Sequence, residues 1–364
     1  MKALEFYAGP KAIAQLRAHG LRAQDIAVIP AAAGGPKGLI LQALDQWLFG
    51  SWLPGAARKR SLIGASIGAW RMVAACHADP VAAFQRLGDF YCGQRYPHKP
   101  PPQLVSAMCR QLLTDFIGGH EAEILANPQF HLHLLTVRGR GLLGAPQRKA
   151  TAAAGFAQAT LANLRSRQRL AGHLQRVVIG DARDSMAWMK TGFDAFDTHF
   201  APLTAANLDS ALLASATLPL IMQPVAGIPA APPGTYWDGG LIDYHLAFPY
   251  SHLARESESD LVLYPHFAPK IVPGWLDKAM PWRHASSARQ KNWYDNVLLV
   301  APSPAFRHSL PRKKLPDRQD FHHYGLDHDR RILNWKQAIG EGQRLRDEFA
   351  AFVDKPDLSL LRPL

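Results

Sequence analysis

The feature that most constrains the fold of this chain is a short apolar run that recurs along it, each time bounded by turn-forming residues. The runs cover residues 26–31, 62–65, 132–137, 177–180, 261–264 and 297–300. Their length suits buried β-strands, and the longer segments between them carry apolar residues at helical spacing. Strands that alternate with helices form a mostly parallel sheet that helices cover on both faces. The sequence therefore predicts an α/β protein with three layers.

Helical spacing is clearest in five of the intervening segments. They cover residues 39–49, 81–91, 104–116, 158–170 and 330–353, the last interrupted by Gly340 and Gly342. After residue 264, prolines and aromatic residues are dense and periodicity is poor, which indicates loops. We therefore predict a catalytic α/β domain over 1–264 and a loop-rich C-terminal extension over 265–364, which ends in a helix and packs on the same domain.

Composition places the chain among proteins with a large buried core, since 48% of its 364 residues are hydrophobic. Its three cysteines have spacings that fit neither a zinc site nor a disulfide framework, so we predict reduced, buried thiols. Lys2, Glu5 and Lys11 leave no continuous apolar segment for a signal peptide. These features predict a cytoplasmic protein.

A long uncharged run between Asp209 and Asp238 has the length of a membrane span. Its five prolines would remove backbone donors and kink a helix repeatedly. We interpret the run as buried core and irregular loop.

The formal net charge of +12 favours anionic partners, either nucleic acid or the head groups of acidic lipids. The basic residues are scattered and no nucleic-acid-binding motif accompanies them, so we expect no nucleic acid partner. A solvated basic surface is the alternative to a lipid partner. Residues 46–60 place aromatic side chains beside a basic cluster, which suits an anionic membrane surface or, alternatively, a helix packed on the sheet.

A glycine-rich loop, AAAGGPKG at residues 31–38, follows the first apolar run. Its amides can hold a phosphate, or the negative charge that forms on an ester oxygen during acyl transfer. A phosphate-binding P-loop needs a Ser or Thr after its lysine, and here Gly38 follows Lys37. A phosphate- or nucleotide-binding protein is therefore the less favoured alternative.

Ser66 lies in the motif GASIGAW, after an apolar run and before a helical pattern. In a nucleophile elbow, the serine sits at a strained strand-to-helix turn, and the residues two before and two after it must be small. Gly64 and Gly68 occupy these positions. The first amides of the following helix would stabilise an oxyanion near Ser66. Because such a motif also arises by chance, it needs support from the rest of the chain.

Asp238 follows the uncharged run and precedes Gly239 and Gly240. Two glycines let the backbone turn tightly, which can direct a carboxylate into a crowded site. An Asx turn that closes a strand is the alternative interpretation. A serine hydroxyl needs a base to become a nucleophile, and Asp238 is the candidate.

In chain order, these motifs and the segment ASATLPLIMQP at residues 214–224 resemble the patatin-like phospholipase family, whose motifs read G-G-G-x-[RK]-G, G-x-S-x-G, A-S-x-A-x-P and D-G-[GA]. The resemblance spans residues 31–240. It implies a patatin-like three-layer α/β fold, lipid acyl esters as substrates, Ser66 as the nucleophile and Asp238 as its base. The implied oxyanion donors are the amides of Gly34, Gly35, Lys37, Gly38 and Ile67. No metal and no cofactor are expected.

The chain departs from the family pattern in three places. Ala33 stands where the family has its first glycine, and Pro36 has no amide hydrogen to donate. Tyr244 lies in the stretch after D-G-G, where family members often carry an asparagine. The departures indicate altered substrate preference or a loss of activity.

A carboxylate with the reference aspartate pKa of about 3.9 is a weak base for a serine. Burial in apolar surroundings raises the pKa of an acid and makes it a better proton acceptor. A triad that includes a histidine is the mechanistic alternative, with His245, His199 and His252 as candidates.

We therefore predict an enzyme, a serine acyl hydrolase that cleaves fatty-acyl esters of phospholipids or related lipids through a Ser-Asp dyad and an acyl-enzyme intermediate. The alternative is a catalytically weak lipid-binding or membrane-associated protein that retains the pocket. We interpret the stretch FHHYGLDHDR, residues 321–330, as a polar loop in which Asp327 or Asp329 caps the last helix, in preference to a metal cluster.

Overall fold

The computed structural model describes residues 2–145, 148–255, 260–284 and 292–364. The strands in these residues are β1 (Leu4–Ala8), β2 (Ile26–Ala31), β3 (Arg60–Ala65), β4 (Phe130–Gly139), β5 (Leu174–Gly180), β6 (Thr198–Pro202), β7 (Val225–Ala226), β8 (Thr235–Asp238), β9 (Leu261–Pro265), β10 (Val297–Pro302) and β11 (Leu361–Pro363). The helices are α1 (Pro10–His19), α2 (Gln42–Trp47), α3 (Ile67–Cys76), α4 (Pro80–Gly93), α5 (Pro102–Ile117), α6 (Glu121–Ala126), α7 (Lys149–Arg165), α8 (Arg167–Leu170), α9 (Ala187–Lys190), α10 (Leu208–Ser215), α11 (Pro304–Ser309), α12 (Gln319–Tyr324), α13 (His328–Glu341) and α14 (Gln343–Asp354).

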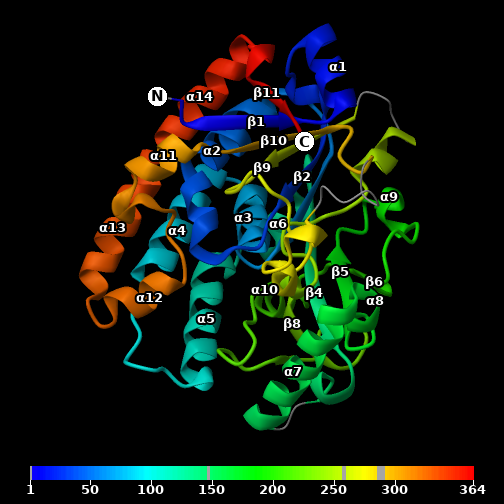
Figure 1. Ribbon diagram of the computed structural model, residues 1–364, viewed down its shortest axis with the longest axis vertical. Coiled ribbons are helices and arrows are strands. Elements are labelled where there is room, and N and C mark those ends of the chain that lie inside the picture. The colour runs from blue at the N-terminus through cyan, green and yellow to red at the C-terminus, as the bar shows by residue number, and fades with distance from the viewer. Residues whose placement is uncertain (1, 146–147, 256–259, 285–291) are drawn as a thin grey trace.

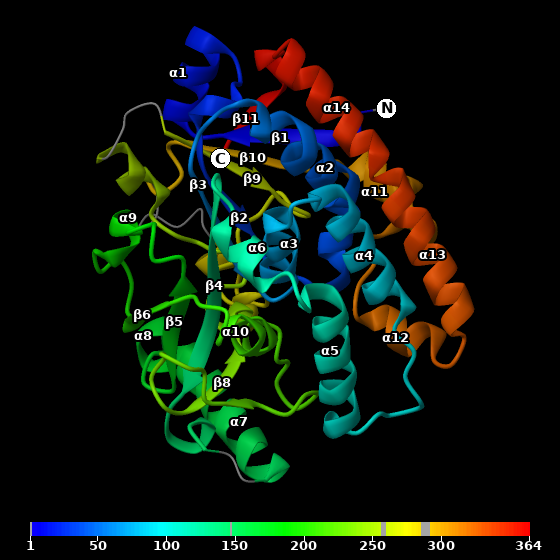
Figure 2. The same cartoon turned by 180° about the vertical axis from the view of Figure 1, so that it is seen from behind.

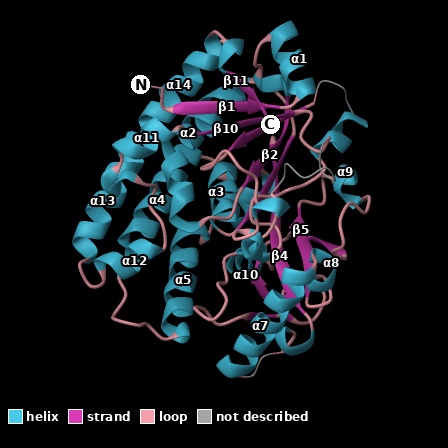
Figure 3. Ribbon diagram, in the orientation of Figure 1, coloured by secondary structure: helices cyan, strands magenta, loops and turns pink. Residues whose placement is uncertain are grey.

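These elements form one mixed, mostly parallel sheet between two groups of helices, which confirms the predicted three-layer α/β fold. Helices α4, α5 and α11 to α14 lie to one side of the strands, and α7 to α9 lie to the other (Figure 1). The strands run between the two groups as a continuous band (Figure 3). Seen from behind, α3 and α6 lie over the strands (Figure 2).

The strand order is β11-β1-β10-β9-β2-β3-β4-β5-β6, with β8 paired to β4 and β7 to β8. Pairs from β10 through β9, β2 and β3 to β4 are parallel, whereas β4 runs antiparallel to both β5 and β8. Strand β10, from the last quarter of the chain, lies between β1 and β9, so the segments before and after residue 264 share one sheet. Strands β1 and β11 pair in parallel and bring both ends of the chain to one edge (Figure 1).

All six apolar runs are strands, and β2, β9 and β10 are buried along their whole length. Burial on both faces explains why these sequences are apolar without alternation. The prediction of irregular structure is wrong at the two ends of the uncharged run, which form α10 and β8. The closing helical segment divides into α13 and α14 at Gly342, where a Cβ would lie 2.5 Å from the carbonyl oxygen of Ile40.

The aromatic stretch at residues 46–60 packs against the core. The rings of Trp47 and Trp52 stack with centroids 5.7 Å apart, and each meets the edge of Phe349 in α14 at 6.0 Å. Phe49 also meets the edge of Phe130, the first residue of β4, at 5.3 Å, so the stretch packs both on the sheet and on α14. The three cysteines are free thiols, as predicted, and one of them, Cys109, is only partly buried. Across the described ranges, no helix combines enough length with enough apolar character to pass through a lipid bilayer.

Candidate active site

The glycine loop and Ser66 meet at one edge of the sheet because the strands that precede them are parallel neighbours. Ala31, the last residue of β2, pairs with Gly64 near the end of β3. The loop after β2 and the turn after β3 therefore leave the sheet side by side. This is the carboxyl edge of the parallel strands, where α/β proteins bind their ligands.

Asp238 reaches Ser66 because β3 and β8 pair with the same edge of β4, one directly after the other. The first part of β4 pairs with β3 and the following three residues pair with β8, both on the edge opposite to β5. Since β8 runs in the opposite direction to β3, the last residues of the two strands face each other. Ala65 pairs with Leu135, and Asp238 pairs with the next residue, Thr136.

Ser66 sits at a sharp turn between β3 and α3, with φ 55° and ψ −129°. A non-glycine residue with positive φ is strained, as expected for a nucleophile elbow. A Cβ on Gly68 would lie 1.9 Å from the carbonyl oxygen of Ala31, and one on Gly64 would lie 2.5 Å from the amide nitrogen of Ala69. Only glycine at both positions lets α3 approach the strands this closely.

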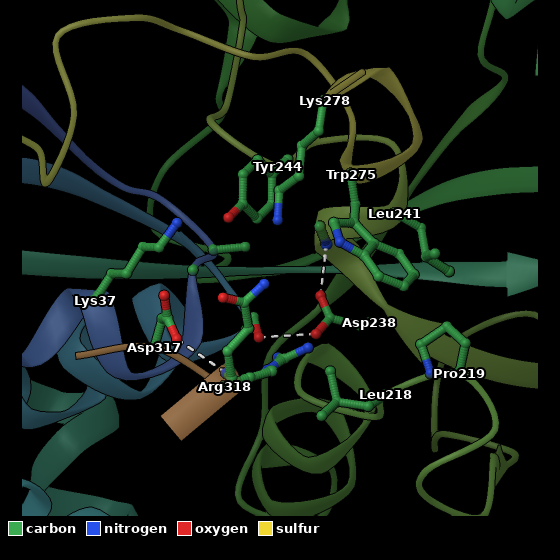
Figure 4. A pocket seen from close by; sticks show the side chains of 15 residues that line it. Lys37, Leu218, Pro219, Asp238, Leu241, Tyr244, Trp275, Lys278, Asp317 and Arg318 are labelled. Carbon is green, nitrogen blue, oxygen red and sulfur yellow. Dashed lines mark hydrogen bonds between the residues drawn. The ribbon is translucent and has the colours of Figure 1, made fainter. Parts of the chain in front are cut away.

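The Ser66 hydroxyl donates a hydrogen bond to Oδ2 of Asp238 at 2.8 Å, and the Gly240 amide donates to Oδ1 at 2.7 Å (Figure 4). Ser66 is 4% exposed and Asp238 6%. Burial raises the pKa of Asp238, and the opposing effects of the Arg318 charge and of these two hydrogen bonds are smaller. The carboxylate is thus placed and tuned to accept the serine proton.

The last residue of α10 and the segment that follows it hold both members of this pair by their backbones. The Ser66 amide donates to both Oγ and the carbonyl oxygen of Ser215, at 3.0 and 3.1 Å, and the Asp238 amide donates to the carbonyl oxygen of Thr217 at 2.9 Å. Ser215 in turn donates its hydroxyl hydrogen to the carbonyl oxygen of Leu135 at 2.7 Å. Residues 214–217 therefore fix the spacing of the dyad. The sequence analysis identified this segment only by its resemblance to a motif.

Close packing around the two positions after Asp238 requires glycine at both of them. A Cβ on Gly239 would lie 2.3 Å from the carbonyl oxygen of Leu135, and one on Gly240 would lie 2.7 Å from Cβ of Ala33. The Ala33 methyl group therefore occupies the space that Gly240 leaves. The Ala33 amide donates to the carbonyl oxygen of Tyr244 at 2.9 Å, so these two departures from the family pattern are in contact.

The glycine loop turns at Gly35, which has φ 58°, and continues as a 3₁₀ helix (Gly35–Leu41). Within the described residues, no acceptor takes the amide hydrogens of Gly34, Gly35 or Ile67. Gly34 and Lys37 line a cavity together with Ser66. The amides of Lys37 and Gly38 lie inside the 3₁₀ helix, which leaves Gly34, Gly35 and Ile67 as the donors that remain open to a ligand.

The histidines of the triad alternative lie apart from the dyad. In the described ranges, no histidine forms a hydrogen bond with Ser66 or Asp238. Nδ1 of His245 lies 3.0 Å from the carbonyl oxygen of Lys270, and burial lowers its pKa well below the usual range. His252 contacts Thr191, and the His199 side chain forms no hydrogen bond with any residue that the structure describes. The geometry therefore favours a dyad.

Two cavities meet at Ser66. The larger, of about 680 Å³, is lined mainly by apolar and aromatic side chains such as Trp70 and Phe90, and Ile67 lies in its wall. The smaller, of about 340 Å³, contains Asp238 and several charged residues (Figure 4). Ser66, Leu218 and Arg318 belong to both, so the serine hydroxyl lies at their junction.

The charged residues of the smaller cavity include three cations, Lys37, Lys278 and Arg318. Partial desolvation, together with the charges of Lys37 and Arg318, lowers the pKa of Lys278 to about 8. Sequence analysis did not identify Lys278 or Arg318, because neither lies in a motif and only the fold brings them to Ser66.

A possible set of metal ligands lies elsewhere. In the described residues, His77, His120 and Glu123 have ligand atoms within 4.8 Å of one another. His77 follows the last residue of α3 and Ser66 precedes the first, so the rise of the helix separates them by about 16 Å. In the stretch 321–330, Asp327 caps α13 by accepting the Arg330 amide at 3.2 Å, as predicted, but the prediction of a loop is wrong because residues 321–324 belong to α12 and residues 328–330 to α13.

Comparison with models of known protein families and with curated proteins gives no match for this chain. What the site can do is therefore inferred from its residues and their geometry.

Proposed function

We propose that this chain is a serine acyl hydrolase of the patatin-like kind, cleaving fatty-acyl ester bonds of phospholipids or related lipids. One observation carries the proposal: the hydroxyl of a strained serine lies 2.8 Å from a buried carboxylate, at the junction of an apolar and a charged cavity. A serine held in this way has a base within hydrogen-bond distance and space for an ester on either side.

In the first half of the reaction, Oγ of Ser66 attacks the acyl carbonyl carbon and its proton passes to Oδ2 of Asp238. The carbonyl oxygen becomes an oxyanion, and the open amides of Gly34, Gly35 and Ile67 are the candidate donors to it. One well-placed donor contributes about 3–4 kcal/mol to the stability of such a transition state. The intermediate then collapses, the bond to the alcohol breaks, and Asp238 returns the proton to the departing oxygen.

In the second half, water attacks the acyl-enzyme and gives a proton to Asp238. The bond between Ser66 and the acyl carbon breaks, Ser66 recovers its proton, and the fatty acid leaves. The nucleophile, the base and the donors all come from the chain, so the proposed reaction uses no cofactor.

The larger cavity supports a long acyl chain as the group that is transferred. Its apolar lining begins beside Ser66, and its rim carries Ile221 and Leu326, which are 49% and 62% exposed. Exposed apolar side chains at the mouth of a cavity suit contact with a lipid surface. The net charge of +12 would add attraction to anionic lipids, and we propose a peripheral position at such a membrane.

A panel of phospholipids and neutral acylglycerols, assayed with the wild type, Ser66→Ala and Asp238→Asn, tests the proposal. We expect fatty acid release by the wild type and almost none by either variant. Equal hydrolysis by all three proteins would remove both residues from the mechanism. Binding of lipid by all three proteins without release of fatty acid would favour a lipid-binding protein that retains the pocket.

A further inference from the structure

The smaller cavity holds more positive charge than its own residues neutralise. Within the described residues, none of Lys37, Lys278 and Arg318 forms an ion pair with a carboxylate. Asp238 and Asp317 also line the cavity, but Asp238 supplies one negative charge against three positive ones, and Nζ of Lys314 lies 2.7 Å from Oδ1 of Asp317 and offsets its charge. Like charges that face one another without partners are unfavourable unless an anion joins them.

The three cations come from separate parts of the chain and line the same cavity as Asp238. Lys278 and Arg318 approach from opposite sides in the view of Figure 4, and Lys37 extends from the glycine loop. Nζ of Lys278 lies 4.2 Å from the centre of the Tyr244 ring, which holds the side chain over the cavity. A methyl group on Gly35 would lie 3.1 Å from Nε of Arg318, so this guanidinium lies against the glycine loop.

The two cavities define how an ester would lie across Ser66. An acyl chain in the apolar cavity leaves the alcohol half of the ester on the other side, in the cavity with the three cations. A guanidinium and ammonium groups are the side chains that hold phosphate in proteins. An anion at this position would satisfy the cations and fix the scissile carbonyl beside the open amides.

We propose that Lys278 and Arg318, with Lys37, form a binding site for a phosphate group on the leaving alcohol, so that the preferred substrates are acyl esters of a glycerol phosphate. This inference rests on the proposed function. Two of the three residues, Lys278 and Arg318, lie after position 264, in the part of the chain that carries none of the catalytic motifs.

The experiment compares two esters that differ only by the phosphate group, monooleoylglycerol 3-phosphate and uncharged monooleoylglycerol, at low ionic strength in the same neutral detergent. We expect the ratio of kcat/KM, phosphate over neutral, to be about tenfold or more for the wild type, the effect of one charge-assisted contact. Lys278→Gln and Arg318→Gln should each lower this ratio severalfold. Lys11→Gln and Arg17→Gln, on the exposed face of α1, are matched controls and should keep the wild-type ratio.

The outcomes distinguish the inference from the function on which it rests. A wild type that hydrolyses both esters with equal kcat/KM overturns the phosphate site and leaves the hydrolase intact. Absence of hydrolysis of both esters, together with no fluorophosphonate labelling of Ser66, overturns the function itself. Inhibition by inorganic phosphate in the wild type but not in Arg318→Gln, with a substrate ratio near one, would assign the cavity to free phosphate and also overturn the inference.

Discussion

Replacing Asp238 with asparagine separates the catalytic role of this carboxylate from its effect on stability. The Asn oxygen can accept the Gly240 amide, as Oδ1 does at 2.7 Å, and the Asn amide group can donate to Oγ of Ser66, where Oδ2 now lies at 2.8 Å. Shape and hydrogen bonds are therefore preserved. The substitution removes the negative charge and the ability to accept a proton.

The activity of this variant should fall by about three orders of magnitude, because a general base contributes about 10²- to 10⁴-fold to the rate. At about 1.4 kcal/mol for each tenfold change, the loss corresponds to about 4 kcal/mol of transition-state stabilisation.

Stability should change in the opposite direction. Burial raises the pKa of Asp238 above its unfolded value, so the ionised carboxylate destabilises the folded protein. At neutral pH, Asp238→Asn should therefore be more stable than the wild type by about 1–2 kcal/mol. The gain in unfolding free energy of the variant over the wild type is full above the folded-state pKa of Asp238, and it decreases as the pH falls through that pKa. It vanishes below the unfolded-state pKa, where the carboxyl is protonated in both states.

Calorimetric unfolding at several pH values, combined with kcat/KM for a lipid ester, measures both effects. Asp194→Asn is the control, because Asp194 binds buried Arg176 through bonds of 2.6 and 3.1 Å, and the interactions with Arg176 outweigh burial and lower the pKa of this carboxyl. Its loss breaks an ion pair and should destabilise the protein by about 3 kcal/mol or more. If Asp238→Asn unfolds at a lower temperature than the wild type near neutral pH, or retains a tenth of its activity, the reasoning is refuted.

Three further outcomes follow from the geometry. Gly68→Ala places a methyl group 1.9 Å from the carbonyl oxygen of Ala31 and should destabilise the protein by about 3 kcal/mol. Urea unfolding would measure this loss, and a stability near that of the wild type would contradict the close packing at the elbow. Ser215→Ala removes the hydroxyl that links the Ser66 amide to the Leu135 carbonyl oxygen, although the Ser215 carbonyl oxygen still accepts that amide at 3.1 Å. It should lower kcat about tenfold with little change in KM, whereas unchanged kcat would show that this hydroxyl does not position the dyad. Preference for a phosphate-bearing ester should decline above about pH 8 as Lys278 loses its charge, and a pH profile of the substrate ratio that stays flat through pH 9 would contradict the role of this lysine.

The strands that could be predicted from the sequence are those buried on both faces. The continuous apolar runs that form β2 and β10 are sufficient to predict these two strands. Strand β8 has four residues, follows two prolines and a glycine, and gives no such pattern. Its position beside β4 is a property of the folded sheet. The antiparallel pairing of β4 with β5 and β8 also depends on tertiary structure, because period and composition do not encode strand direction.

The residues of the site also form two groups, those that the sequence predicts and those that only the fold brings together. Ser66 and Asp238 could be predicted because each requires glycines at fixed offsets, which leave a local pattern in the sequence. Lys278 and Arg318 have no such requirement, since a long flexible side chain reaches the cavity from a backbone of any conformation. Their contribution is visible only when separate segments of the chain are brought together.

The most direct test of the central claim, that Ser66 is the nucleophile activated by Asp238, is mass spectrometry of the protein trapped with a slowly hydrolysed lipid ester. We predict a covalent acyl group on the peptide that contains Ser66 in the wild type, and almost none in Asp238→Asn over the same time. An acyl group on another residue, or equal acylation of Ser66 in the two proteins, would contradict the account.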